Sequence, residues 1–259
     1  MPLRILQLSD THLTAEADGT LLGFPPHESL RRVVAAAQAE APDLILHTGD
    51  LAQDSTPAAY TTLGPLLRPL GAPCYWIPGN HDVEAVMGAA LEGAPFRPQR
   101  SFRAGGWRFL LLNSAVPGEV HGRLTNRTLN WLDDELAAHP DAPTCLALHH
   151  APIPVGAAWL NPINLHNPDS LRARIDAHPQ IKLILFGHIH QAMEAHWGDA
   201  TLYSCPSTCF QFAPHAETFA LDDAAPGYRM LTLHPDGTFA TEVKRVAVPF
   251  TPNADATGY

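Results

Sequence analysis

The stretch ILQLSDTHL, residues 5–13, carries the pattern that decides the fold. An apolar run over residues 3–8 stops abruptly, and Asp10 and His12 follow it. A carboxylate and an imidazole are costly to bury unless they have partners. We therefore interpret residues 3–8 as a buried strand whose carboxyl end leads into a polar site.

The same pattern returns at the ends of four more apolar runs. Asp50 follows residues 44–47, Asn80, His81 and Asp82 follow residues 74–77, His149 and His150 follow residues 144–148, and His188 and His190 follow residues 181–186. In open α/β sheets, ligands bind in the crevice beyond the carboxyl ends of the strands. One histidine near a strand end is usually structural, but five clusters in series indicate one shared site.

The spacing within two of these clusters bears on where their side chains point. Asp10 and His12 are two residues apart, as are His188 and His190. In an extended backbone, residues i and i+2 point to the same side. We therefore expect the two members of each pair to aim at one point.

Strand-like and helix-like segments alternate along the first 190 residues or so. The sequence predicts helices over residues 27–41, 57–70, 83–91, 125–139 and 170–177, a long loop over 151–168, and hairpins over 101–113 and 228–246. Such alternation, followed by mostly β segments, predicts an α/β sandwich of two sheets with helices outside. We interpret residues 1–259 as a single domain with a surface tail at 249–259.

Composition narrows the class of protein. The chain has 259 residues and a formal net charge of −10, which makes a nucleic-acid partner a poor fit because phosphate contacts need Lys and Arg. No window reaches the ~20 apolar residues of a membrane span, and the N-terminus lacks a signal-peptide pattern. We expect a cytoplasmic protein, either a monomer or a homodimer, without a membrane partner. Reduced thiols are expected at Cys74, Cys145, Cys205 and Cys209.

The side chains of the five clusters form a mixed oxygen and nitrogen ligand set without sulfur. They supply seven candidate metal ligands: Asp10, His12, Asp50, Asn80, His149, His188 and His190. Such ligands suit Mn, Fe, Zn or Ni. Seven exceed what one zinc ion takes, but they suit two metals with Asp50 as the bridge. Two-metal sites perform in-line displacement at phosphorus.

The block order D-x-H, G-D, G-N-H-D, H, G-H-x-H, from Asp10 to His190, resembles the calcineurin-like metallophosphoesterases. The stretches HGRL, PSTCFQF and APGYR are similar to the class III bacterial 3′,5′-cyclic AMP phosphodiesterases. The resemblance implies a four-layer α/β/β/α sandwich. It also implies a binuclear enzyme that hydrolyses cyclic AMP to 5′-AMP.

The resemblance also implies roles for individual residues. One metal would be held by Asp10, His12, Asp50 and His190, and the other by Asp50, Asn80, His149 and His188. The implied metals are Fe(II) or Mn(II), with Zn as an alternative. A bridging hydroxide would attack in line, opposite the ribose 3′ oxygen. The implied catalytic residues are Asp50, His81 and Asp82. His81 would stabilise or protonate that departing oxygen, and Asp82 would orient His81.

Two points stay open at the level of sequence. His150 is the alternative to His149 as the fourth-block ligand, and Ala151 stands where many relatives have proline. The candidates for substrate binding are Asn80, His81, His150, Thr208, Gln211 and Phe212, with Ser207 and Trp159 as further ones. Ordinary strand packing explains the candidates outside the five clusters nearly as well; these are Ser207, Thr208, Gln211, Phe212 and Trp159.

Other functions compete with the cyclic AMP reading. A broad-specificity phosphodiesterase, such as a glycerophosphodiesterase, would use the same ligands. A metal-dependent protein that binds cyclic nucleotides without turnover is the alternative from another class. A nuclease is disfavoured by the acidic chain, and nothing specific in the sequence supports a protein phosphatase.

Overall fold

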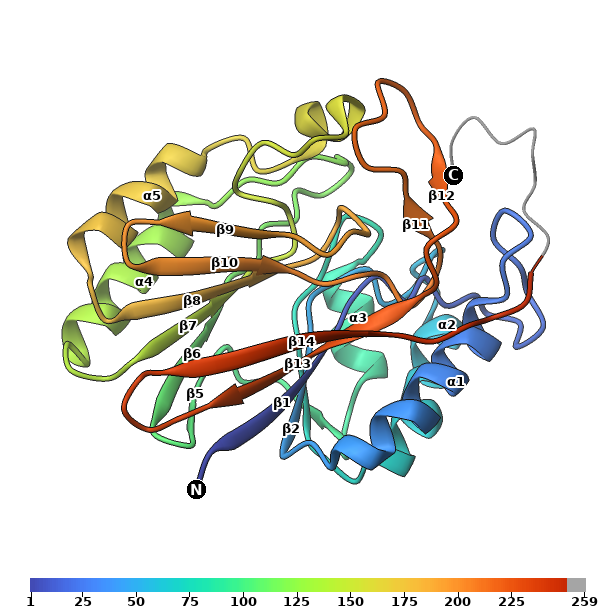
Figure 1. The fold of residues 1–259 in the computed structure, drawn as a ribbon, viewed down its shortest axis with the longest axis horizontal. Coiled ribbons are helices and arrows are strands. Elements are labelled where there is room, and N and C mark those ends of the chain that lie inside the picture. The colour runs from blue at the N-terminus through green and yellow to red at the C-terminus, as the bar shows by residue number, and fades with distance from the viewer. Residues whose placement is uncertain (251–259) are drawn as a thin grey trace.

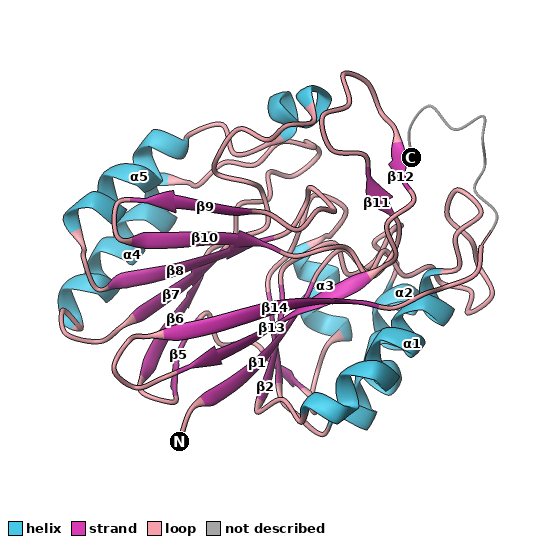
Figure 2. Ribbon diagram, viewed as in Figure 1, coloured by secondary structure: helices cyan, strands magenta, loops and turns pink. Residues whose placement is uncertain are grey.

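The computed structural model describes residues 1–250 and contains two six-stranded sheets stacked between layers of helices (Figures 1 and 2). The first sheet has the strand order β14-β13-β1-β2-β3-β4. Its strands are β1 (Leu3–Leu8), β2 (Leu44–His47), β3 (Cys74–Trp76), β4 (Phe96–Arg97), β13 (Gly227–Leu233) and β14 (Phe239–Arg245).

The second sheet has the order β5-β6-β7-β8-β10-β9. Its strands are β5 (Ser101–Ala104), β6 (Trp107–Leu111), β7 (Thr144–Ala147), β8 (Ile181–Phe186), β9 (Glu194–Trp197) and β10 (Ala200–Ser204). A separate pair is formed by β11 (Gln211–Phe212) and β12 (Leu221–Asp222).

Five α-helices and three 3-10 helices lie between these strands in the described residues. The α-helices are α1 (Pro26–Ala37), α2 (Pro57–Leu67), α3 (Glu84–Ala90), α4 (Asn126–Ala138) and α5 (Pro168–Ala177). The 3-10 helices are η1 (Gln38–Glu40), η2 (Arg68–Leu70) and η3 (Ala158–Ile163). No helix among residues 1–250 is both long and apolar enough to cross a membrane.

Three apolar clusters define the four layers. Along β1, Ile5 packs into the cluster between the sheets, whereas Leu6 and Leu8 pack into the cluster that holds α1 and α2. This alternation follows from the period of two along a strand. The third cluster joins α4 and α5 to the second sheet. Figure 1 shows α4 and α5 on one side and α1 and α2 on the other. The predicted α/β/β/α sandwich is confirmed.

The strand directions decide where the functional residues meet. β1, β2 and β3 run parallel in one sheet, and β7 and β8 run parallel in the other. Parallel strands place their carboxyl ends at one edge. The five sequence clusters follow these five strands, so they lie at that edge of the two stacked sheets.

The predicted elements are present, with shifts at their ends. The α-helical part of the predicted helix at 27–41 stops at Ala37, and a 3-10 turn carries the chain to Ala41, which has a left-handed φ of 44°. The predicted loop over 151–168 contains the 3-10 helix η3. Most of the predicted tail at 249–259 lies outside the described residues, and the single-domain interpretation stays a prediction.

Candidate metal centre

Hydrogen bonds from backbone N–H groups tie loops of both sheets together. Asp10 N–H donates to the carbonyl of Gly49 at 2.9 Å, which joins the loops after β1 and β2. Gly187 N–H donates to the carbonyl of His149 at 3.0 Å, which joins those after β7 and β8. The N–H of His188 donates to Asp10 Oδ1 at 3.1 Å and so connects the two sheets. The loops form one buried, cross-linked cluster.

The predicted ligands converge in space. Asp10, His12 and His190 form one group whose ligand atoms lie within 4.8 Å of one another. Asp10, Asp50 and His149 form a second group on the same criterion, so the groups are contiguous. Further groups are His12–Asp50–His81 and His149–His150–His188. Asn80 Oδ1 lies 3.2 Å from His149 Nε2 and adds an amide oxygen to this side.

The histidine rings are oriented by protein acceptors on the side away from this cluster. His149 Nδ1 donates to the carbonyl of Thr48 at 2.8 Å, and His190 Nδ1 donates to that of Phe210 at 2.9 Å. His12 Nδ1 lies 2.8 Å from Gln53 Oε1. A proton on Nδ1 leaves the Nε2 lone pair of a neutral ring for a metal, which is how ligating histidines are usually held.

The Nε2 atoms meet in a way that suits a cation. His12 Nε2 and His190 Nε2 are 3.1 Å apart, and both face the cluster. Two lone pairs at that distance repel unless a proton or a cation lies between them. In the described part of the chain, the buried Nε2 of His188 has no hydrogen-bond partner. Buried polar atoms are rarely left without partners, so this donor set fits divalent metal ions.

Burial and mutual charge set the protonation of the cluster. Burial lowers the pKa of His12 and of His188 to about 3, so both rings are neutral near pH 7, as metal ligands must be. Burial raises the pKa of Asp10 to about 7, and the Asp50 carboxylate adds to this rise against the opposing charge of His149.

Asp50 and His149 behave as a pair. Burial acts to raise the pKa of Asp50, but the nearby histidines His149, His81 and His12 together outweigh it and lower that pKa. Burial likewise acts to lower the pKa of His149, yet Asp50 raises it to about 9. Positive charge next to Asp50 therefore stabilises the carboxylate, and a divalent cation would serve the same purpose.

The backbone of the ligand residues is not extended, so the assumption behind the pairwise spacing argument was wrong. Asp10, His12, Asp50, His188 and His190 all have φ between 45° and 69°. Left-handed φ is uncommon for residues other than glycine. The members of each pair still aim at the same cluster, but the tight turns direct them, and a period of two along a strand does not.

Two glycines let the loops approach this closely. Gly49 has a φ of 100°, a conformation that favours glycine. Gly79 needs its missing side chain instead, because an added Cβ would lie 2.6 Å from the backbone nitrogen of Asp50 and 2.8 Å from its Cγ. Any larger residue at position 79 would displace Asp50.

Asp82 does not have the contacts predicted for it. Its carboxylate accepts hydrogen bonds from the backbone N–H groups of Gly79 at 2.9 Å, Leu51 at 3.1 Å and Ala52 at 3.3 Å. The ring of His81 instead has Nδ1 3.4 Å from the carbonyl of Gln53. Asp82 therefore holds two metal-ligand loops together, and the expectation that it orients His81 is corrected.

The structure places several predicted substrate contacts away from open space. The ring of His150 is completely buried, with Nδ1 2.8 Å from Ser114 Oγ and Nε2 3.1 Å from the carbonyl of Val120. Gln211 donates to the carbonyl of Ser207 and accepts from Arg245, and Thr208 is fully buried. Ser207 Oγ donates to the carbonyl of Asp10 at 2.7 Å. These residues support the metal cluster from behind.

Phe212 has two roles in this arrangement. Its ring stacks on His190 with centroids 4.2 Å apart and an interplanar angle of 19°. It also lines a cavity of about 500 Å³ together with Trp159 and Phe219. The cavity reaches the metal cluster at Asn80, His81 and His188. Its volume is within the range of small-molecule sites.

The sequence model of the family described as calcineurin-like phosphoesterase matches residues 3–192, which include every predicted metal ligand. The chain belongs to the calcineurin-like phosphoesterases. It is 44% identical to the 3′,5′-cyclic adenosine monophosphate phosphodiesterase CpdA of Escherichia coli K12, over 99% of this chain and 95% of that protein. It is 42% identical to a 3′,5′-cyclic-nucleotide phosphodiesterase of Nostoc sp., over 95% of this chain and 93% of that protein.

Solved structures agree with this assignment at the level of the fold. A dimetal phosphatase from Danio rerio superposes with a TM-score of 0.67 at 15% identity, over 95% of this chain and all of that one. Identity this low supports the shared fold of this phosphoesterase and nothing finer. The resemblance of the sequence to CpdA-type enzymes is confirmed by the relatives above.

Some residues that build this phosphoesterase site were not predicted from sequence. Gln53 orients His12 and lies in the block TGDLAQD, where its position three residues after Asp50 was an available signal. Phe210 acts through its carbonyl and its ring on His190. Phe219, Leu160 and Ile163 line the cavity from distant segments, and no local pattern identifies them.

Proposed function

We propose that this chain is a 3′,5′-cyclic-nucleotide phosphodiesterase that converts cyclic AMP to 5′-AMP at a binuclear metal centre. The observation that carries the proposal is the position of the cavity. It opens directly onto Asn80, His81 and His188 and has an aromatic wall. A phosphodiester at the metal cluster would leave its nucleoside in that cavity.

The ligand groups support two metal positions. Asp10, His12 and His190 would hold one cation, and Asn80, His149 and His188 the other, with Asp50 contributing to both. When bound, two divalent cations stabilise charge on the phosphoryl transition state and activate water for in-line attack. Fe(II) and Mn(II) are the metals we propose, and Zn(II) is the alternative in the test.

His81 is the residue we propose for the departing ribose oxygen. It is half-buried at the mouth of the cluster and lines the cavity. Because a carbonyl can only accept, the contact of Nδ1 with the Gln53 carbonyl favours a proton on that nitrogen, so proton donation to the ribose oxygen would come from Nε2. The backbone N–H of His81 donates to Asp50 Oδ1 at 2.9 Å, which fixes the loop relative to the ligands.

The aromatic wall suits the nucleobase. Trp159 meets Phe212 edge-on with centroids 4.9 Å apart, and Phe219 completes the group at 5.4 Å from Trp159. A planar base gains most from such offset or edge-on contacts. His150, Thr208 and Gln211, which are buried behind the ligands, leave the base-binding role to this wall.

A substrate panel tests the function. Protein reconstituted separately with Fe(II), Mn(II) and Zn(II) is incubated with cyclic AMP and with glycerophosphoethanolamine, and products are separated by chromatography. We expect 5′-AMP from cyclic AMP at the higher kcat/KM. Faster turnover of glycerophosphoethanolamine would indicate the broad phosphodiesterase instead. Cyclic AMP that binds but survives overnight would indicate a binding protein without turnover.

A histidine variant tests the proposed role of His81. His81→Ala should keep its metal content but lose roughly 10²–10⁴-fold in kcat on cyclic AMP, the usual contribution of a general acid. The loss should shrink on bis(p-nitrophenyl) phosphate, whose leaving group needs little protonation. His196→Ala, at an exposed histidine on β9, is the matched control. Equal losses on both substrates would assign His81 to phosphate binding.

The cytoplasmic location, the monomeric or dimeric state and the exclusion of nucleic-acid partners stay predictions. They rest on composition and on the small-molecule size of the cavity.

A further inference from the structure

A second cavity lies in a part of the chain with an unusual charge. Residues 97–127 contain six of the sixteen basic residues, all arginine, and only one carboxylate, Glu119, although the whole chain carries a net charge of −10. The cavity, of about 730 Å³, lies where part of this segment faces helix α4. None of its lining residues lines the cavity at the metal cluster.

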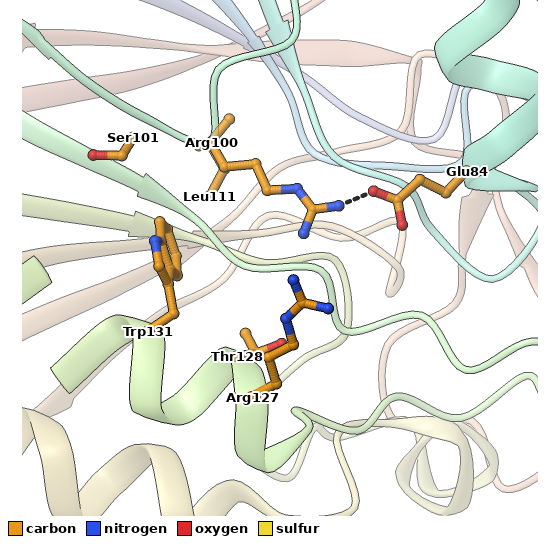
Figure 3. A pocket seen from close by; sticks show the side chains of 7 residues that line it. All are labelled: Glu84, Arg100, Ser101, Leu111, Arg127, Thr128 and Trp131. Atoms are coloured by element: carbon orange, nitrogen blue, oxygen red, sulfur yellow. Dashed lines mark ion pairs between the residues drawn. The ribbon is translucent and has the colours of Figure 1, made fainter. Parts of the chain in front are cut away.

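Two guanidinium groups point into this cavity. Figure 3 shows Arg100 and Arg127 turned toward each other, with the Trp131 ring on the same wall. Arg100 forms an ion pair with Glu84, whose other oxygen accepts from the Asn113 amide at 2.8 Å. Arg127 has no carboxylate within ion-pair distance in residues 1–250. One carboxylate therefore faces two positive charges.

The positive charge affects Arg100 itself. Burial lowers the pKa of Arg100, and the charge of Arg127 lowers it further. A negatively charged ligand between the two groups would relieve this repulsion. Guanidinium groups bind phosphate with two parallel hydrogen bonds, and their charge-assisted contacts are about twice as strong as neutral ones.

Part of the cavity lining is apolar. Leu111 is buried on β6, and Trp131 lies on α4 with part of its ring packed against the core below. An indole beside a cationic corner suits a ligand that has a flat ring at one end and a phosphate at the other. We propose that this cavity binds a small phosphomonoester with an aromatic portion, such as a nucleoside 5′-monophosphate.

The cavity is connected to the metal-side loops through Glu84. Glu84 is the first residue of α3, and the loop that carries Asn80, His81 and Asp82 ends immediately before it. A phosphate on Arg100 would compete with Glu84 for the same guanidinium. A ligand that displaces Glu84 would therefore act on the residue that follows the catalytic loop in the chain. Such a ligand need not be the substrate.

The Glu84 competition gives the proposal an opposite-sign test. Glu84→Gln removes the competing carboxylate and should tighten binding of 5′-AMP at this cavity. Arg127→Gln removes a phosphate donor and should weaken that binding by at least about tenfold, the lower end for a hydrogen bond to a charged group. Arg103→Gln is the matched control, because Arg103 lies on the neighbouring strand β5 outside the lining.

Site-resolved labelling separates this cavity from the metal centre, which also attracts phosphate. Metal-loaded protein is treated with phenylglyoxal, with and without 5′-AMP, and the modification rate of each arginine is read by peptide mass spectrometry. We expect 5′-AMP to slow modification of Arg100 and Arg127 but not of Arg103. Calorimetry should show two binding events for 5′-AMP, of which Arg127→Gln weakens one.

Three results would overturn the proposal. One is an unchanged modification rate of Arg127 at saturating 5′-AMP, and another is equal slowing at Arg103. The third is weaker binding in Glu84→Gln. If inorganic phosphate protects as well as 5′-AMP does, and Trp131→Leu binds 5′-AMP as tightly as the unaltered protein, the aromatic part of the proposal is overturned.

Discussion

Gly79 offers a sharp test of how the metal centre is built. In Gly79→Ala the new Cβ would lie 2.6 Å from the nitrogen of Asp50, whereas ordinary contacts begin at about 3.4 Å. Restoring that separation needs a shift of roughly 0.8 Å, which exceeds the tolerance of about 0.5 Å for a functional constellation. Asp50 belongs to two of the ligand groups, one with His12 and His81 and the other with Asp10 and His149, so both metal positions should be affected.

The expected magnitudes follow from this displacement. Overpacking costs about 1–3 kcal/mol in free energy of unfolding, which lowers the Tm of a chain this size by about 2–12 °C. Metal affinity should fall by at least about 10- to 100-fold, the range for disturbed residues that support metal ligands. The assay is metal content per chain after dialysis against a graded series of chelator concentrations, with thermal melts of metal-free protein alongside.

The matched control is Gly88→Ala. Gly88 lies inside helix α3, and an added Cβ there meets nothing within 4 Å. Alanine in a helix interior is favoured over glycine by about 0.5–1 kcal/mol, so this variant should melt slightly higher and keep its metals. Gly79→Ala protein that retains two metals against chelator as well as the unaltered protein does would refute the account of the crowded cluster.

Three further predictions concern the residues behind the ligands. Phe212→Ala should lower the free energy of unfolding by about 3–5 kcal/mol in urea titration, because a fully buried ring is removed; a loss below 1 kcal/mol would contradict its packing on His190. Asp82→Asn should lower it by about 1.5–3 kcal/mol, because an amide N–H₂ would face backbone donors; an unchanged urea midpoint would contradict the role of Asp82 as a loop clamp. Thiol titration without reductant should find no fast-reacting group in the native protein and four groups in denaturant, and the loss of two would contradict four free, buried thiols at Cys74, Cys145, Cys205 and Cys209.

The sequence predicted the fold well where local pattern and burial coincide. The strands β1, β2 and β8 have the predicted bounds because each is an apolar run whose residues are nearly all buried. Residues 27–41 were less predictable at their end, since nothing local marks the change from α-helix to 3-10 turn before Ala41. The predicted metal ligands were recognisable because each lies within a few residues of the end of a strand.

The partners of buried polar residues were not predictable. Gln211 pairs with Arg245, 34 positions away, and the backbone carbonyl of Thr208 accepts from Ser29 Oγ at a separation of 179 residues. Both were predicted as candidates for substrate binding, yet both are buried. The partner of Asp82 was wrongly predicted for the same reason. Its sequence neighbour His81 contacts Gln53, whereas the Asp82 carboxylate accepts from Leu51, which is distant in sequence. Long-range pairing decides such roles.

The residues with left-handed φ show that this site is built at a cost in conformational free energy. Nine non-glycine residues among residues 1–250 have positive φ, and five of them are predicted metal ligands. Such conformations cost about 1–3 kcal/mol each, so chance would not concentrate them on one cluster. Each is held by a neighbouring loop, as when Asp10 N–H binds Gly49 and His188 N–H binds Asp10. The turns bring ligands from two separate sheets to one point, which extended strand ends cannot do. The strain is therefore tied to the convergence of the ligands, and the cross-linked loops that maintain it are as much part of the centre as the ligands themselves.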